Sequence, residues 1–316
     1  MGMRVRNRNI QQRMTGQFKN YNLVYNEETG LHDCYGDVKV DKDLVSPDGK
    51  LIIKFGVVKG DFDCRHSNLT SLKGAPQEVG GSFDCSDNQL TSLEGAPQEV
   101  DGDFICYVNQ LTSLEGAPQV VGGSFYCSHN KLTSLAGSPK EVGEYFDCGI
   151  NNLTSLDGAP QKVGGDFNCR HNNLTSLEGV PKEVGGSFDC SDNQLTSLEG
   201  APKKVDKDFI CYVNQLTSLE GAPQVVGGSF YCSHNELTSL AGAPKEVGEY
   251  FDCGINNLTS LDGAPQKVGG NFRCDNNNLV FDEIHFYGCL PDVIGGELKA
   301  GDGCDYELAK EYYDKK

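Results

Sequence analysis

The chain has 316 residues, of which 37% are apolar and 23% charged, so it can bury a sizeable core and is not a disordered tail. Its formal net charge is −18, from 27 Lys and Arg against 45 Asp and Glu. This acidity argues against nucleic acid as the main ligand and favours a protein partner with a basic or neutral surface. The 39 Gly, the 14 Cys and the lack of Trp indicate a turn-dense, repetitive architecture.

Residues 1–60 are basic, with ten Lys and Arg against seven Asp and Glu. Arg4, Arg6, Arg8 and Arg13 predict a basic arm that is solvated or docks an acidic neighbour, which includes self-association with another copy of the chain. We expect strands at 38–40 and 51–55, joined by a turn at 46–49, to form an N-terminal cap. No signal peptide and no membrane-spanning run is predicted, because no apolar segment is long enough.

A 21-residue repeat occupies residues 61–282. Each unit places Phe two positions before a Cys and Leu five positions after it, and the first ten units add a second Leu eight positions after the Cys and a Pro four positions further on. The repeated cysteines are Cys64, Cys85, Cys106, Cys127, Cys148, Cys169, Cys190, Cys211, Cys232, Cys253 and Cys274. Two five-repeat blocks, 64–168 and 169–273, differ at only 11 of 105 positions, which indicates a block duplication.

Within each repeat, the alternation of Phe83, Asp84, Cys85 and Ser86 has the period of two expected of a strand with one buried face. A strand this short needs neighbours, so we expect successive units to stack as a parallel sheet at about 4.8 Å per coil, with Phe packed on Phe and Cys on Cys. The Gly-Gly and Gly-Ala-Pro segments would turn the chain around the coil. The remaining residues leave no room for a full helix and predict extended or 3₁₀ structure on the far side.

The stretch F-D-C-S-D-N-Q-L at residues 83–90 resembles the leucine-rich repeat pattern L-x-L-x-x-N-x-L, with Phe and Cys replacing the first two Leu. L-T-S-L-E-G-A-P also resembles the short repeats of bacterial effectors. Together with V-G-G-x-F-x-C it is most similar to uncharacterised leucine-rich repeat proteins of tailed bacteriophages and their hosts. The resemblance implies a β solenoid, a horseshoe of 21-residue coils with a concave parallel sheet and little helix. A three-sided parallel β-helix is the alternative fold.

Two columns of side chains are expected inside this solenoid. In the resembling family, the Asn found in ten coils from Asn88 to Asn277 turns inward, and its amide satisfies backbone groups of the neighbouring loop. We expect the Cys to be buried free thiols, because in-register parallel strands point their Cβ atoms the same way, which opposes a disulfide. The sequence has no Cys-x-x-Cys pair of the kind that binds zinc, so neither a metal nor a cofactor is predicted. Residues 283–316, with one short helix, would form the C-terminal cap.

Positions beside Phe and Cys would face outward, and they vary from coil to coil. They predict an apolar and aromatic patch at Ile105, Tyr107, Val108, Tyr126 and Ile150, flanked by Asp84, Asp87 and Asp147. The duplication repeats the patch at Ile210, Tyr212, Val213, Tyr231 and Ile255, five coils or roughly 24 Å away. A patch rimmed by charge is typical of a protein-binding site. Tyr and Ile also favour strands that bind nothing, which is the alternative interpretation.

We therefore predict a non-enzymatic scaffold that binds protein through its concave face. The phage resemblance implies a virion surface or tail component, or a cytoplasmic effector or inhibitor that binds a host protein; no membrane or nucleic-acid partner is expected. The alternative from another class is an enzyme that uses His66 beside Asp87 and His171 beside Asp192 as acid–base pairs. The sequence offers no nucleophile, phosphate loop or metal cluster beside these pairs.

Overall fold

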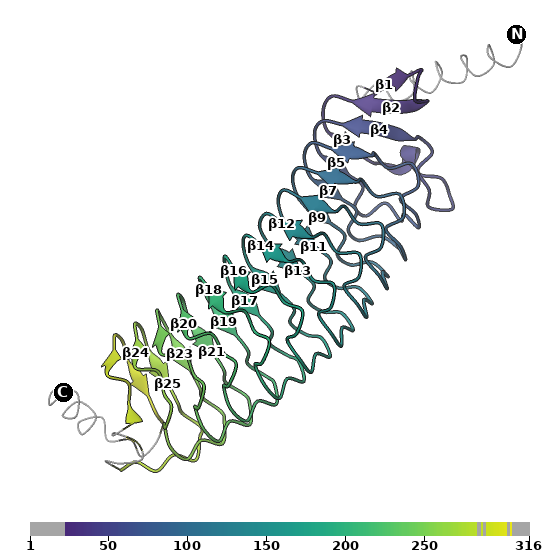
Figure 1. Ribbon diagram of the computed structural model, residues 1–316. Coiled ribbons are helices and arrows are strands. Elements are labelled where there is room, and N and C mark those ends of the chain that lie inside the picture. The colour runs from purple at the N-terminus through teal and green to yellow at the C-terminus, as the bar shows by residue number, and fades with distance from the viewer. Residues whose placement is uncertain (1–22, 283–285, 287–288, 302–303, 305–316) are drawn as a thin grey trace, which may run out of the picture. The chain divides into compact units, whose positions relative to one another are not determined.

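The computed structural model describes residues 23–282, 286, 289–301 and 304. The chain divides after Lys131 into two compact units, and the short segment Gly137–Pro139 belongs to the first of them. Each unit is a stack of coils whose short strands form two separate ladders (Figure 1). Among the described residues, no helix has the length and apolarity that a bilayer crossing requires.

In the first unit, one ladder has the strand order β1-β2-β4-β6-β8-β10 and the other has the order β3-β5-β7-β9-β11. All described pairs are parallel except the antiparallel pair of β1 with β2. The elements are β1 Leu23–Asn26, β2 Leu31–Cys34, β3 Val38–Lys39, the 3₁₀ helix η2 Lys42–Leu44, β4 Phe55–Val58, β5 Phe62–Asp63, β6 Glu78–Val79, β7 Phe83–Asp84, β8 Glu99–Val100, β9 Phe104–Ile105, β10 Val120–Val121 and β11 Phe125–Tyr126.

In the second unit, the even-numbered strands β12 to β26 form one ladder and the odd-numbered strands β13 to β27 form the other. The strands are β12 Glu141–Val142, β13 Phe146–Asp147, β14 Lys162–Val163, β15 Phe167–Asn168, β16 Glu183–Val184, β17 Phe188–Asp189, β18 Lys204–Val205, β19 Phe209–Ile210, β20 Val225–Val226, β21 Phe230–Tyr231, β22 Glu246–Val247, β23 Phe251–Asp252, β24 Lys267–Val268, β25 Phe272–Arg273, β26 Val293–Ile294 and β27 Leu298–Lys299.

The odd-numbered strands from β3 onward form what we call the phenylalanine ladder. Each Phe pairs in register with the Phe of the next coil, as Phe188 does with Phe209 and Phe209 with Phe230. These rings are completely buried, and the ring centroids lie 5.4 Å and 5.2 Å apart in these two pairs. Offset aromatic pairs of this kind each stabilise a fold by about 0.5–1.5 kcal/mol beyond the burial of their area. The predicted column of stacked Phe side chains is confirmed.

The even-numbered strands form a second ladder, which we call the valine ladder and which the sequence did not predict. Its inward residue is a buried Val, such as Val184 or Val205, and the residue before it points outward. A short linker joins each valine-ladder strand of the repeats to the phenylalanine-ladder strand that follows, and in several coils it begins with Gly-Gly, as at 185–186. The coil therefore has two adjacent sheet faces, and extended structure without a sheet is confined to the Leu-Thr-Ser-Leu side.

The strands expected in the N-terminal region differ from those observed. β3 covers Val38–Lys39, but the second strand begins only at Phe55, and the two lie in different ladders. The reason is that Val38 pairs with Phe62 and Val58 pairs with Val79, so this region continues the columns of the repeats. The basic arm at Arg4 to Arg13 and the helix expected near the C-terminus lie outside the described residues.

The thiols form a second buried column. All fourteen cysteines lie in the described part and are thiols rather than disulfides, and twelve of them are buried, from Cys34 to Cys274. Cys169 Sγ donates to Asp189 O at 3.3 Å, and Cys190 Sγ donates to Ile210 O at 3.4 Å, so these two thiols each contact a carbonyl of the next coil. Burial raises the pKa of the Cys190 thiol well above its usual range. The expectation of free, inward thiols is confirmed.

The Asn column links each coil to the one before it. Leu174 N donates to Asn193 Oδ1 at 3.0 Å, while Asn193 Nδ2 donates to Cys169 O at 3.1 Å in the preceding coil. The same bonds recur along the stack, for example around Asn214. Because these groups lie in a buried loop, where water does not replace a lost partner, the amide is a structural requirement. The predicted inward Asn is confirmed.

The turn that follows the second Leu requires Gly. Gly200 has a φ of +89°, and a Cβ there would lie 2.8 Å from the carbonyl carbon of Leu177 in the preceding coil. Any other residue at this position would therefore have to adopt the disfavoured left-handed backbone conformation, and its Cβ would clash with the backbone of the preceding coil. The buried Pro two positions later, Pro202, fixes the return of the chain toward the valine ladder.

Thiol reactivity tests this burial. We expect Ellman's reagent to titrate two thiols of the folded chain, the half-buried Cys289 and Cys304, and all fourteen after denaturation, because the attacking species is an accessible thiolate. The thiol of Cys289 should react slowly, since burial and Asp262 raise its pKa to about 11. A Cys289→Ser/Cys304→Ser chain should show no fast reaction. Rapid titration of additional thiols under native conditions would contradict the buried column.

Asn193→Ala should lower the free energy of unfolding by about 2–3 kcal/mol, because it leaves buried backbone groups of two coils without partners. The neighbouring Asn173 is exposed and provides a matched control. Asn173→Ala should change the unfolding free energy by less than about 0.5 kcal/mol. Urea denaturation followed by circular dichroism measures both, and equal effects of the two variants would refute the structural role of the inward amide.

Candidate protein-binding face

The second copy of the predicted patch lies within one unit, on the outer side of the phenylalanine ladder. Ile210 on β19 pairs in register with Tyr231 on β21, so their side chains project from adjacent coils on the same side. Val213 and Ile255 follow the strands at one edge, where Val213 is 40% exposed. Tyr212, Ile210, Tyr231 and Ile255 are half-buried. The structure thus brings the five residues together as one partly exposed surface, which we call the tyrosine patch.

Val213 and Ile255 adopt a backbone conformation that their side chains disfavour. Both have a φ of +53°, in the left-handed region, where a β-branched residue is a genuine outlier. Every described coil turns this way two residues after its Cys, and other coils place His, Asp or Asn there, as at Asp192. Asp and Asn tolerate the left-handed conformation because their short side chains bond locally. The patch therefore holds apolar side chains where the turn itself favours polar ones.

Two tyrosines of the same face were absent from the predicted patch. Tyr250 is half-buried, and its ring lies edge-on to that of Tyr231 with centroids 5.6 Å apart. Tyr145 is the equivalent residue of the first block and accepts a hydrogen bond from Asn168 Nδ2 at 2.9 Å. Both lie three positions before the Cys of their coil, on the same side as the predicted position between Phe and Cys. The period of two would have found them if it had been extended one residue pair toward the N-terminus.

Arg273 borders the tyrosine patch on its C-terminal side. Arg273 Nη1 donates to Asp252 Oδ2 at 3.4 Å, and the guanidinium also contacts Asp275. These carboxylates raise the pKa of Arg273 further above its usual range. Burial and the nearby Asp252 raise the pKa of Tyr250 to about 12. The hydroxyl of Tyr250 is therefore a neutral hydrogen-bonding group throughout the physiological pH range.

The carboxylates expected to rim the first patch are already engaged with neighbouring groups. Asp84 is buried, and its Oδ1 accepts from the amide and the hydroxyl of Ser86 at 2.9 and 2.6 Å. Asp87 pairs with His66 at 3.6 Å, and Asp147 accepts from Gly149 N at 3.1 Å. Asp84 was expected at the surface, but its carboxylate folds back over the turn that its own strand enters.

The same arrangement recurs in the second block. Asp189 accepts from Ser191 N at 2.9 Å, and burial raises the pKa of its carboxyl. The carboxylate of this residue, like that of Asp84, therefore serves the turn of its own coil.

The first copy of the patch is divided between the two units. Ile105 pairs with Tyr126 in register, and Tyr107 and Val108 follow on the coil of Ile105, all in the first unit. Val108 is 40% exposed and has a φ of +51°, as in the second copy. Ile150 and Asp147 belong to the second unit. Only the second copy of the patch therefore lies within a single unit.

The His–Asp pairs form but lie at the surface. His66 Nε2 is 3.6 Å from Asp87 Oδ2, and His171 Nδ1 is 3.5 Å from Asp192 Oδ2. Both histidine side chains are mostly exposed. Within the described part of the chain, no cluster of three His, Cys, Asp or Glu is placed to hold a metal ion. A solvent-exposed His–Asp contact of this kind contributes little to stability.

The coil architecture of this chain is similar to that of known solved structures. The chain matches YopM from Yersinia enterocolitica WA-314 with a TM-score of 0.56 and 22% identity, over 76% of this chain and 55% of that chain. The fold is that of a leucine-rich repeat solenoid. A weaker match, the APL1 leucine-rich repeat domain, has a TM-score of 0.43 and 17% identity over 79% of this chain and 72% of that chain.

The present solenoid thus spans about half the length of YopM. No protein-family model and no curated protein matches the sequence. The predicted β solenoid of 21-residue coils with little helix is confirmed, and the departures of Phe and Cys from the Leu positions leave the coil intact.

Alkaline titration tests the environment of Tyr250. Its pKa of about 12 lies above the ordinary value of 10.0, so the folded state favours the protonated phenol. The stability that this group contributes is complete below pH 10 and is lost as the pH rises toward 12. Burial also raises the pKa of Tyr145, so we expect Tyr250→Phe to remove one part of the late-titrating tyrosinate absorbance and to reduce the loss of stability over this interval. If the absorbance that Tyr250→Phe removes were instead the part that appears near pH 10 in the wild-type chain, the result would contradict the burial of the Tyr250 hydroxyl.

Proposed function

We propose that the chain is a non-enzymatic scaffold that captures a protein through the tyrosine patch and its copy around Tyr126. The observation that carries this proposal is the left-handed Val213 and Ile255. A left-handed L-residue costs about 1–2 kcal/mol, and strain of this kind is typically kept where the side chain has a function. A fold that needed only a turn there would be more stable with Asn, which the chain uses at Asn276.

The composition of the patch indicates the chemistry of its partner. Two Tyr and three aliphatic residues supply apolar area at low cost in side-chain entropy, and Tyr hydroxyls add hydrogen bonds at the edge. The carboxylates of Asp189 and Asp252 already bond to groups within the scaffold. They therefore contribute negative electrostatic potential to the patch rather than direct contacts with a partner. The partner should therefore present apolar side chains within a basic or neutral surface, which the net charge of −18 attracts.

The setting of this capture follows from the phage-like repeats and forms part of the proposal. We favour a surface or tail component of a virion, and the second candidate is an effector or inhibitor that binds a host protein in the cytoplasm. A structural role requires many copies per particle, so quantitative mass spectrometry of purified virions distinguishes the two. Many copies per particle support the virion role, and absence from particles supports the effector.

Capture experiments with the full chain test the patch. Because the duplication supplies two copies, both must be changed: Tyr126→Ala with Tyr231→Ala should weaken retention of partner proteins at least about tenfold. Tyr35→Ala is the matched control, since Tyr35 is 74% exposed and lies outside the tyrosine patch. Thermal unfolding verifies that both variants fold. Equal retention by the wild-type chain and the double Tyr variant would remove the patch from consideration.

The strained turns give a second, independent test. Val108→Asn with Val213→Asn should raise the free energy of unfolding by about 1 kcal/mol per site, because Asn tolerates the left-handed backbone. The same variant should capture less partner, since it removes exposed apolar groups. Asp192→Asn is the control at an equivalent turn and should change stability little. If the Val variant gained no stability, the turns would hold no strain and the proposal would lose its main support.

A further inference from the structure

The two blocks of the duplication differ most clearly on the valine ladder. Of the 11 differences between blocks 64–168 and 169–273, four lie on or beside the outer face of this ladder. The first block has Gln77, Gln98, Glu99 and Gly102, and the second has Lys182, Lys203, Lys204 and Lys207. Each replacement makes the second block more positive. In a chain with a net charge of −18, this is a local reversal of sign.

The four lysines lie on two consecutive coils of the second unit and define what we call the basic face. Lys204 on β18 pairs in register with Glu183 on β16, and all four lysines are exposed. Lys204 Nζ lies 2.8 Å from Asp206, and Lys207 Nζ lies 3.9 Å from Asp166. Across the described residues, Lys182 and Lys203 have no ion-pair partner. The basic face therefore keeps free positive charge.

The equivalent positions on the valine ladder of the first unit hold no lysine, and we call them the acidic face, defined by Glu78, Glu99 and Asp101. The basic face keeps the equivalents of two of these carboxylates, Glu183 and Asp206, beside its four lysines. Glu78 and Glu99 are directly paired on β6 and β8, and both are exposed. Like charges directly opposite on neighbouring strands destabilise a sheet. Neighbouring Gln77 and Gln98 supply no positive charge. A cationic surface placed against this face would relieve the repulsion.

Each face has an exposed apolar residue one coil further along. Val120 is 60% exposed and pairs in register with Glu99, and Val225 is the equivalent residue beside the basic face, at 56% exposure. One coil of each face has a Gly-Gly segment beside the ladder, at 80–81 and 185–186, where the preceding coil leaves no room for a Cβ; at Gly185 it would lie 2.2 Å from Gly164 O. The two faces thus share one backbone frame and one apolar contact, and they differ in charge.

We infer that the basic face of one copy of this chain docks on the acidic face of a second copy. A second copy is the partner that the chain itself specifies, because it offers complementary charge on the same coil spacing. The contact joins different surfaces of the two copies, so it is heterologous. It uses the valine ladder and leaves the tyrosine patch on the other ladder free for the proposed capture. The inference therefore stands or falls separately from the proposed function.

Exchange of residues between the blocks tests this contact in the full-length chain. Every substitution introduces a residue that the other block already holds at the same coil position, so the fold accommodates it. The acidic-only variant carries Lys182→Gln, Lys203→Gln, Lys204→Glu and Lys207→Gly. The basic-only variant carries Gln77→Lys, Gln98→Lys, Glu99→Lys and Gly102→Lys. The exchanged variant combines all eight changes and so swaps the two faces.

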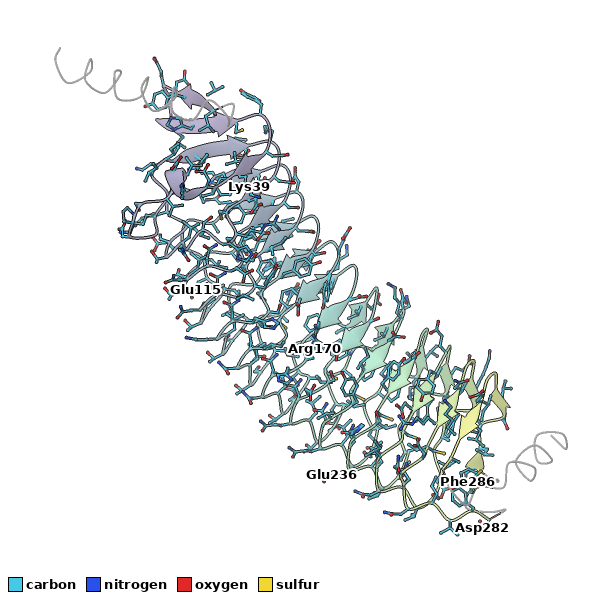
Figure 2. The ribbon with its side chains drawn as sticks, turned by 180° about the vertical axis from the view of Figure 1, so that it is seen from behind. Lys39, Glu115, Arg170, Glu236, Asp282 and Phe286 are labelled. Carbon is cyan, nitrogen blue, oxygen red and sulfur yellow. The ribbon has the colours of Figure 1, made fainter. Side chains whose placement is uncertain are left out.

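Sedimentation velocity over a range of concentrations measures the association. We expect the wild-type chain to associate at low salt and to dissociate at high salt. Each single-sign variant should associate at least about tenfold more weakly, whereas the exchanged variant and a mixture of the two single-sign variants should recover the wild-type affinity. Lys131→Glu is the charge control. It copies Glu236, which Figure 2 shows on the edge away from the strands, and it should leave association unchanged.

Three results would overturn the inference. They are a wild-type chain that stays monomeric at low salt, association that is the same in all variants, and an exchanged variant that fails to recover. Circular dichroism melting verifies folding of each chain. If the basic-only variant did not fold, the acidic-only variant with its salt dependence would still decide the question.

Discussion

The in-register stacking of nearly identical coils is the constraint on which the rest of the structure depends. Each strand has only two residues in the repeats, and a strand of that length has no stability of its own. Stability comes from columns that run from coil to coil: Phe rings, thiols, the valines of the second ladder and the Asn amides. Because every column needs the same residue at the same position, the repeat is regular inside and free to vary outside.

That freedom is where recognition can arise. Of the outward positions, some serve the coil itself, as Asp84 and Asp189 do when they bond to the serine two residues later. Others carry Tyr, Ile and Val that the coil does not require, and at Val213 the coil even disfavours them. The contrast between engaged carboxylates and strained apolar residues is what separates a scaffold position from a candidate binding position.

The duplication adds a comparison inside a single molecule. Two blocks with the same backbone frame have kept their buried columns and the tyrosine positions, while charge has changed sign on the valine ladder. Exposed charges are tolerated at such sites because solvent screens them, so their cost to folding is small. The same screening makes them suitable for weak, salt-dependent contacts between molecules. Two sheet faces meeting along one coil thus allow one chain to carry two different kinds of surface.

The sequence by itself determined the 21-residue coil, the buried Phe and Cys columns and the inward Asn, because a repeated period transmits a local pattern into a stack. Only the tertiary structure decided that the Glu-Val pairs form a second ladder, that Asp84 is buried and that Val213 sits in a left-handed turn. These features depend on what lies in the neighbouring coil and on the backbone angle of the turn, and neither is encoded in the alternation of apolar and polar residues. The alternation, if extended, places Tyr250 on the outer side of its coil, but its ring contact with Tyr231 spans two coils and is visible only in the tertiary structure.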